Sequence, residues 1–365
     1  MKLPPQLLAL AVSLASISVR AAEAPAKPTE TRTRYEDLPP LVELARKEAE
    51  KGDAQSQADL GKMFLFGSGA PLDPVEGVRW LRLSAAQKNS SGQYWLGYAT
   101  LKGLGAAQDA AEARTLLVAA SGNGSIGAQY LLGLVALGSK DSAEAEKWFL
   151  RAASQTNAPS CYQLGLLYRA PGSRQNLTQS HRYFVQAADA GDPRSLYWVW
   201  KDYSTGQGAP KDPAQAAQWL EKAESNDLNC CEIAKLLSNG EDLPANPEEA
   251  LQWYRKAAAR DFFPAQYKLG EIFYTGKGAP QNFPEAVRWF RKAAEQGDRN
   301  AQYFLGKCYF KGEGIRADKI EAYKWAALSE KQGDKLGAYL RQTVANVMTE
   351  AQIEEAKKRL AELEK

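Results

Sequence analysis

The sequence predicts an all-α fold, a solenoid in which about eight helix–turn–helix repeats stack in a row. Two observations support this prediction. A motif returns after 36 residues: the Ala-Gln-Tyr of residues 265–267 is repeated at 301–303, and Trp289 is repeated as Trp325. Within each period, two stretches with helical spacing of apolar residues flank a glycine-rich loop. A fixed period of this length is typical of solenoids, because one helix pair cannot bury its own apolar face.

The best-preserved repeat, residues 265–298, shows how one unit is built from a first helix, A, and a second helix, B. Gly276 is expected to end helix A, and Asn282 is expected to cap helix B. Gly270 stands in the middle of helix A, where it costs about 1 kcal/mol relative to Ala, so we expect a neighbouring backbone to approach it closely. The side chains predicted to be buried are Ala265, Leu269 and Phe273 in helix A and Ala286, Trp289, Phe290 and Ala293 in helix B.

The N-terminus has a different composition. Lys2 precedes an apolar run at residues 7–19, and small residues follow at Ala21, Ala22 and Ala24. This order is typical of a secretory signal peptide, here assigned to residues 1–22. The run is too short to span a bilayer core of about 30 Å. We therefore expect an exported protein, periplasmic or secreted, with no membrane span after signal cleavage.

The rest of the chain divides into three parts. Residues 23–38 are rich in Pro, Thr and charge and are predicted to form a flexible leader. Residues 39–334 form the repeat array, beginning with one capping helix, and residues 335–365 form C-terminal capping helices, the last one starting at a capping box at residues 349–352. The residues at the central position of helix A in the eight repeats are Gly61, Gly97, Gly133, Gly165, Trp200, Ala234, Gly270 and Gly306.

Repeat five breaks the pattern, because Trp200 stands where most repeats have glycine. A Trp cannot occupy a close-packed glycine site without pushing the helices apart. We therefore expect a local change of superhelical curvature near residue 200.

The recurring pattern A-x-Y-x-L-G-x-x-Y-x-x-G-x-G, followed by Asp or Asn and A-x-x-W-Y/F-x-K-A-A-x-x-G-D, resembles the Sel-one-like repeat family, which is related to the tetratricopeptide repeats. The resemblance covers residues 41–334. It implies a right-handed superhelix and a role as an adaptor or scaffold in protein complexes. Some secreted relatives carry two cysteines in every repeat and have been linked to β-lactam binding or hydrolysis, but this chain lacks that regular pairing.

Residues for catalysis or cofactor binding are not evident. His181 is the only histidine, which excludes sites that need several, and it is predicted to be a partly exposed helix residue. The four cysteines, Cys161, Cys230, Cys231 and Cys308, are expected to be structural and mostly buried. With 46 basic and 43 acidic residues interleaved, no basic face indicates nucleic-acid binding. No cofactor or metal is predicted, and a hydrolase acting on cell-wall-related or β-lactam substrates is the alternative to an adaptor.

A partner-binding surface is predicted on the concave face of the superhelix, which in solenoids of this kind is usually lined by A helices. Two positions should face the same way, two residues before and one residue after the central position. In repeat one they are Asp59 and Lys62, whereas in repeats two to five they are mostly apolar: Trp95, Tyr98, Leu131, Leu134, Gln163, Leu166, Trp198 and Lys201. If this strip is exposed, it is a candidate site for a protein or peptide partner. The alternative is that neighbouring A helices bury it, since aromatic stripes are more often core.

Overall fold

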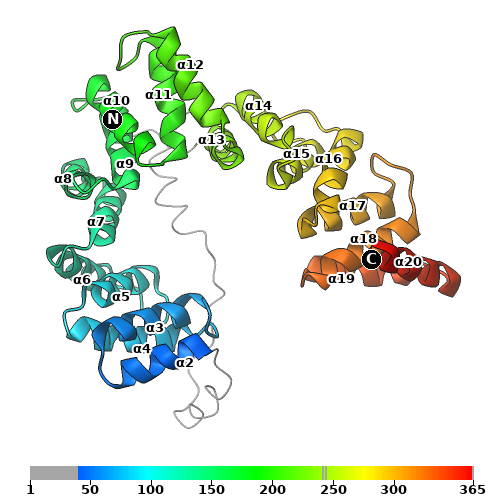
Figure 1. Cartoon of the computed structure of the whole chain (residues 1–365), viewed down its shortest axis with the longest axis horizontal. Helices are drawn as coiled ribbons and strands as arrows, with labels where there is room; N and C mark the ends of the chain where they lie inside the picture. Colours follow the sequence, from blue (N-terminus) through cyan, green and yellow to red (C-terminus); the bar gives the residue numbers. More distant parts are fainter. Residues whose placement is uncertain (1–39, 241, 243–244, 364–365) are drawn as a thin grey trace. The chain divides into compact units, whose positions relative to one another are not determined.

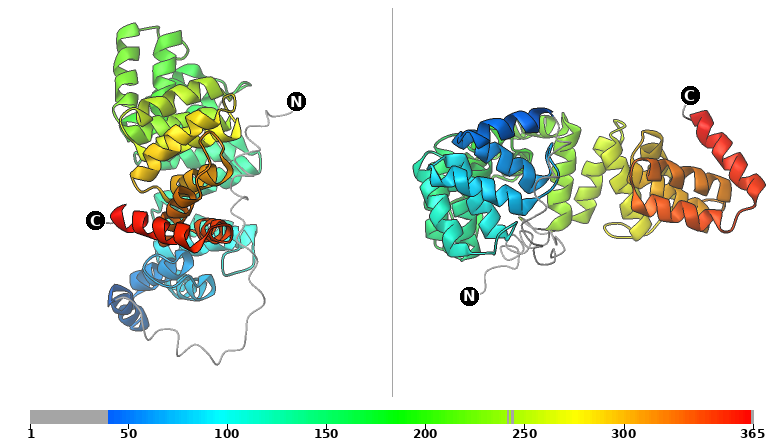
Figure 2. Two further views of the ribbon diagram at one scale, coloured as in Figure 1. Left: turned by 90° about the vertical axis from the view of Figure 1, so that its right-hand side faces the viewer. Right: turned by 90° about the horizontal axis from the view of Figure 1, so that it is seen from below.

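The computed structural model describes residues 40–363 except 241, 243 and 244, and all regular structure in this part of the chain is α-helical. The predicted signal peptide (1–22) and leader (23–38) lie outside the described residues. The chain forms two compact units: the first extends to Asp192 and includes Gln207–Ala209, and the second comprises Pro193–Gly206 and Pro210 onward. Each unit is an all-α stack of helix pairs (Figures 1 and 2), which confirms the predicted solenoid of repeats.

The first unit holds a capping helix and four repeats, in which each A helix is followed by its antiparallel B helix (Figure 1). The capping helix is α2 (Pro40–Glu50), which packs against α3. The A and B helices that follow are α3 (Ala54–Phe66), α4 (Pro74–Ala86), α5 (Ser90–Lys102), α6 (Ala110–Gly122), α7 (Ile126–Gly138), α8 (Ser142–Ala153), α9 (Ala158–Arg169) and α10 (Leu177–Asp189).

The second unit holds the other four repeats and the C-terminal caps. Its repeat helices are α11 (Pro193–Thr205), α12 (Pro213–Glu224), α13 (Asp227–Asn239), α14 (Pro247–Ala258), α15 (Phe263–Thr275), α16 (Phe283–Glu295), α17 (Arg299–Lys311) and α18 (Lys319–Lys331). The caps are α19 (Lys335–Ala345) and α20 (Glu350–Leu363), both of which pack against α18. Among the described helices, none is both long enough and apolar enough to cross a bilayer.

The helix boundaries follow from the capping signals in the sequence. The Asn282 side chain accepts a hydrogen bond of 3.1 Å from the backbone N–H of Glu285 at the start of α16. Gly276 ends α15 in a left-handed conformation with φ of 72°, which glycine adopts without steric cost. Thr349 and Gln352 exchange reciprocal hydrogen bonds of 3.0 and 3.3 Å at the start of α20. The predicted caps and the predicted capping box are therefore confirmed.

The glycines at the centre of the A helices are closely packed against atoms of the B helices. A Cβ atom added at Gly270 would lie 2.5 Å from the ring of Phe290, which is fully buried on the B helix of the same repeat. At this position the three nearest atoms therefore belong to an aromatic ring rather than to a neighbouring backbone. At Gly61 the expectation is correct, because the added Cβ would also lie 2.9 Å from the carbonyl oxygen of Gly77.

In repeat five, the clash expected for Trp200 does not occur, because other side chains of α11 face the core. Ser195, Val199 and Asp202 form the fully buried line of α11, whereas Trp200 is only half-buried. The Trp200 ring instead lies 6.1 Å from the ring of Trp253 on α14. Trp200 therefore does not occupy the close-packed site that glycine fills elsewhere, and the change of curvature near residue 200 stays a prediction.

A pair of side-chain amides, here called the amide clasp, joins helix A to the end of helix B in five repeats. One member lies four residues before the central position, and the other follows the last turn of helix B. The pairs, with N···O distances of 2.8 to 3.1 Å, are Gln57–Gln87, Gln93–Asn123, Gln129–Gln155, Gln266–Gln296 and Gln302–Gln332. Repeats four, five and six have Cys161, Leu196 and Cys230 at the first position instead, so the clasp is missing there.

Candidate functional site

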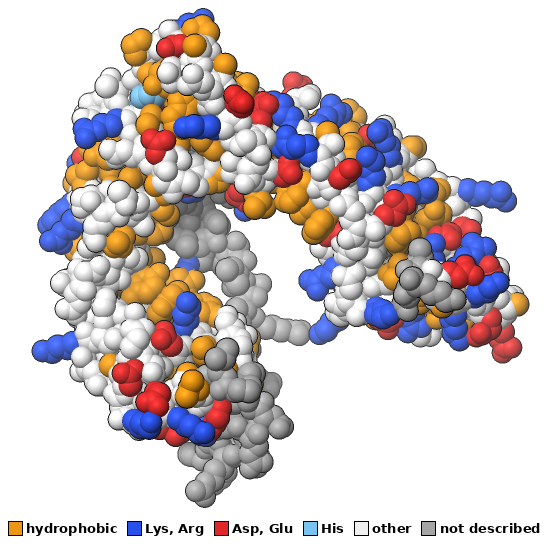
Figure 3. All heavy atoms as spheres, viewed as in Figure 1, with side chains coloured by type: hydrophobic (Ala, Val, Ile, Leu, Met, Phe, Trp, Pro, Cys, Tyr) orange, Lys and Arg blue, Asp and Glu red, His pale blue; other side chains and the backbone are white. Residues whose placement is uncertain are grey.

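Three aromatic side chains on neighbouring A helices of the first unit form a partly exposed cluster, here called the aromatic group. The ring of Phe66, at the end of α3, lies 5.3 Å from Trp95 on α5, and Trp95 lies 5.8 Å from Tyr98, both in edge-to-face geometry. Phe66 is 39% exposed, and Trp95 and Tyr98 are half-buried. Figure 3 shows hydrophobic side chains gathered over α5. Phe66 was not predicted, although an aromatic residue ending helix A was visible in the sequence.

A lysine and a hollow lie beside the aromatic group. The Lys62 ammonium nitrogen is 5.2 Å from the centre of the Trp95 ring, which is cation–π geometry. Lys62 also lines a hollow of about 340 Å³ along α3. This hollow is called the first-helix hollow below. Its other lining residues are Ala45, Ser56, Asp59, Met63 and Ser68. Apolar rings, a cation and polar groups therefore occur together on one face of repeats one and two.

Two of the remaining predicted positions of the first unit are buried and two are half-buried. Leu131 is 6% exposed and belongs to a core cluster with Leu117 and Trp148. Gln163 is also buried, whereas Leu134 and Leu166 are half-buried. At Leu131 and Gln163 the structure therefore matches the burial alternative, whereas both predicted positions of repeat two, Trp95 and Tyr98, stay half-buried.

Trp198 and Lys201 belong to the second unit. Trp198 is 9% exposed and lies within the buried side of α11. The Lys201 ammonium nitrogen is 3.3 Å from a carboxylate oxygen of Glu249 and 4.6 Å from the centre of the Trp200 ring. The cation of Lys201 is therefore already neutralised within its own unit.

The second unit has an aromatic cluster that the sequence analysis did not predict. Phe304 on α17 stacks on Phe290 at 5.0 Å and meets the ring of Tyr274 at 5.4 Å. The Lys307 ammonium nitrogen lies 5.1 Å from the centre of the Tyr274 ring. The Tyr274 hydroxyl donates a hydrogen bond of 2.7 Å to Glu313, and burial together with this carboxylate raises the pKa of Tyr274. These rings join helices α15, α16 and α17, so they act mainly in packing between repeats.

The side chains with catalytic or metal-binding potential lie in structural positions. Cys161, Cys230 and Cys308 are buried free thiols and Cys231 is half-buried. Burial raises the pKa of Cys308 to about 12, which keeps this thiol protonated and unreactive near neutral pH. His181 is half-buried on α10. In the described part of the chain, no three His, Cys, Asp or Glu side chains come close enough together to hold a metal ion.

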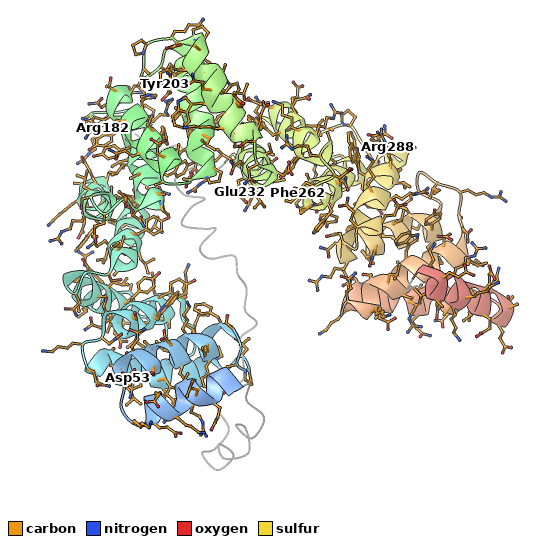
Figure 4. The ribbon with its side chains drawn as sticks, viewed as in Figure 1. Asp53, Arg182, Tyr203, Glu232, Phe262 and Arg288 are labelled. Carbon is orange, nitrogen blue, oxygen red and sulfur yellow. The ribbon has the colours of Figure 1, made fainter. Side chains whose placement is uncertain are left out.

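A second hollow of the first unit, about 910 Å³, lies on the B helices α8 and α10. Leu150 and Ala153 line it from α8, and Arg182, labelled in Figure 4, and Gln186 line it from α10. Cys161 also contributes to its wall. This hollow lies between repeats three and four, and in repeat four Cys161 and Ala190 stand where other repeats have the two amides of the clasp.

Within each unit, tandem helix pairs pack against the next pair, and this arrangement defines an α-solenoid repeat protein. The Sel1 repeat model matches eight segments of the sequence, residues 54–89, 90–125, 126–157, 158–192, 203–228, 230–262, 264–298 and 299–334. The chain therefore belongs to the Sel1 repeat family, as the recurring motif predicted. The fifth match begins inside α11, which agrees with the departure of repeat five from the pattern.

Several solved structures are similar to this chain. The protective antigen c5321 of uropathogenic Escherichia coli, which has an SLR fold, is 28% identical, with 88% of this chain and 78% of that chain covered and a TM-score of 0.46. A Sel1 repeat protein from Oxalobacter formigenes is 25% identical, with 91% and 99% covered and a TM-score of 0.44. The immunity protein Pa5087 from Pseudomonas aeruginosa is 18% identical, with 60% and 82% covered and a TM-score of 0.37.

Proposed function

We infer that this protein is an exported, non-catalytic adaptor that binds another protein through the A helices of its first repeats. The observation that carries this proposal is the aromatic group of Phe66, Trp95 and Tyr98, which is partly exposed on the neighbouring A helices α3 and α5. Large aromatic side chains at the surface are the residues that contribute most to protein–protein affinity. Sel1 repeat proteins commonly act in protein–protein interactions, which agrees with such a surface.

The test is to change Trp95 and Tyr98 together to Ser and to identify captured proteins from the native cell envelope by mass spectrometry. We expect the double variant to lose partners that the unchanged protein retains. A matched control changes Leu83 and Val118 to Ser, because these side chains are also exposed apolar residues of the first unit but lie on B helices. If the Trp95 and Tyr98 variant has a much lower Tm and keeps its partners, these residues are core and the proposed surface is wrong.

Export rests on the composition of residues 1–22, where a basic residue precedes an apolar run and small residues. Expression of the full-length chain followed by cell fractionation tests it. We expect a shortened protein in the periplasm or the medium, with its new N-terminus near Ala21 to Ala24. Full-length protein in the cytoplasm would contradict export.

The hydrolase alternative gains no support from the similar proteins, and three of the four thiols are buried while the fourth, Cys231, is half-buried. Assays of the purified protein with generic ester, amide and β-lactam substrates distinguish the two proposals. We expect no turnover, and reproducible turnover of any of these substrates would favour the hydrolase.

A further inference from the structure

Lysines on the A helices differ in whether a carboxylate of the chain neutralises them. Lys201 lies 3.3 Å from Glu249, and Lys268 lies 2.6 Å from Glu271. Lys62 has no carboxylate within ion-pairing distance among the described residues, and its ammonium group contacts the Trp95 ring instead. Contact with the ring orders the lysine side chain without removing its net charge. Lys62 therefore presents an ordered positive charge that no carboxylate of the chain neutralises.

The surroundings of Lys62 provide apolar contacts on one side and space on the other. Phe66, Trp95 and Tyr98 form an apolar surface, and the first-helix hollow of about 340 Å³ adjoins the lysine. A hollow of this volume is at the lower end of the range for ligand pockets, so it suits a few side chains rather than a large cofactor. The site thus combines a cation with apolar contacts that a short peptide segment can match.

The charge of the site is not uniformly positive. Asp59, three residues before Lys62 on α3, lines the same hollow, and its carboxylate accepts a hydrogen bond of 3.1 Å from the side chain of Gln55. A run of several acidic residues would bring negative charge against Asp59, which is unfavourable. A single carboxylate placed next to Lys62 avoids this repulsion.

On the basis of the proposed protein-binding function, we propose that this surface recognises a short segment of another protein in which one Glu or Asp is flanked by apolar side chains. The carboxylate pairs with the ammonium group of Lys62, and the flanking side chains contact the aromatic group. Burial of the apolar side chains supplies most of the affinity, whereas the ion pair selects acidic over neutral and basic segments.

The experiment measures binding of three peptides to the full protein by calorimetry. The probes are acetyl-Ser-Leu-Phe-Glu-Leu-Ser-amide and the two analogues with Gln or Lys in place of Glu. We expect the Glu peptide to bind about fivefold more tightly than the Gln peptide at low salt, because a partly exposed ion pair is worth up to about 1 kcal/mol. The difference should shrink at 0.5 M NaCl, since salt screens exposed charges.

Variants test whether the preference for the Glu peptide depends on Lys62. Lys62→Gln should abolish the difference between the Glu and Gln peptides, and Lys62→Glu should make the Lys peptide the preferred one. Asp59→Asn should tighten binding of the Glu peptide. Lys268→Gln is the matched control, because Lys268 is paired within its own helix, and it should leave the preference unchanged. All variants alter exposed side chains, so equal Tm values are expected.

The outcomes test the preference for an acidic segment separately from the proposed protein-binding function. Equal binding of the Glu and Gln peptides, or an unchanged preference in Lys62→Glu, overturns the acidic specificity. If none of the peptides binds, the inference is also wrong. It is wrong as well if the protein self-associates and Lys62→Glu abolishes this self-association, because a second copy of the chain then occupies the surface. In each case the protein-binding function is judged separately, by whether the Trp95 and Tyr98 variant loses its cellular partners.

Discussion

At the scale of single residues, the glycine in the middle of helix A is explained in three repeats by a phenylalanine ring that packs against it. In repeats three, four and seven the added Cβ would lie 2.3 to 2.5 Å from a phenylalanine of the B helix. The three pairs are Gly133 with Phe149, Gly165 with Phe184, and Gly270 with Phe290. Each phenylalanine is fully buried. The cost of glycine inside a helix is therefore offset by close packing of a large apolar side chain.

Gly270→Ala should consequently destabilise the protein by about 1–3 kcal/mol, because the new methyl group overlaps a ring that has no free space. The matched control is Gly122→Ala in α6, where an added Cβ has no atom within 4 Å. This change should be neutral or stabilise by up to about 1 kcal/mol, because alanine restricts the unfolded chain. Thermal and urea unfolding of both variants measure the effect, and a destabilised Gly122→Ala with an unaffected Gly270→Ala would contradict the explanation.

At the scale of helices, the amide clasp connects the end of helix B to helix A of the same repeat. Gln302 accepts a hydrogen bond from Gln332 at 2.9 Å and donates one to the carbonyl oxygen of Ala294 on the preceding B helix. Gln332 also donates to the carbonyl oxygen of Gly297. One clasp thus joins the end of helix B both to its own helix A and to the turn of the previous repeat. Buried amides need such partners, since an unsatisfied one is costly.

Gln332→Ala should lower the free energy of unfolding by about 1–3 kcal/mol, because Gln302 is only 4% exposed and would lose its donor. Gln252→Ala on the exposed side of α14 is the control and should change stability by less than about 0.5 kcal/mol. Chemical denaturation followed by circular dichroism measures both. Equal effects of the two substitutions would show that the clasp contributes nothing specific.

At the scale of the whole molecule, the distribution of clasps predicts where the array is weakest. In a repeat protein, stability is approximately a sum over repeats and the contacts between neighbours. Repeats one to three and seven to eight have clasps, whereas repeats four to six do not. The division of the chain into two compact units also falls within the part that has no clasp.

Hydrogen exchange should therefore be faster in the middle of α9 and α11 than in the middle of α5, α7, α15 and α17, because the amide pair is missing there. Mass spectrometry of peptic fragments measures the rates. Uniform rates along the array would contradict the idea that clasps set local stability.

The fold could be predicted from the sequence because its signals are local. Asn282, Gly276 and the pair Thr349 and Gln352 each specify a helix end through hydrogen bonds or backbone conformation within a few residues. The repeat period then requires stacking. The clasp was not predicted, because its two members are about 30 residues apart and each glutamine on its own reads as an ordinary polar residue.

The candidate site could be predicted only in part. Trp95 and Leu131 occupy the same position in consecutive repeats, yet Trp95 is half-buried and Leu131 is buried. The difference arises from their neighbours: Trp95 meets Phe66 at a partly open face, whereas Leu131 packs into a cluster with Leu117 and Trp148. Repeat position therefore identified which residues share a face but did not identify which of them solvent can reach.

The sequence by itself determined the family, the number of repeats and the ends of the helices, since these depend on the period and on interactions within single turns. Only the tertiary structure decided that Phe66 contacts Trp95 and that Trp200 stays out of the glycine site. It also decided that Lys201 is neutralised by Glu249, whereas Lys62 has no carboxylate partner in the described chain. The physical reason is that exposure and charge pairing depend on side chains from other helices, whose approach is set by packing of the whole stack.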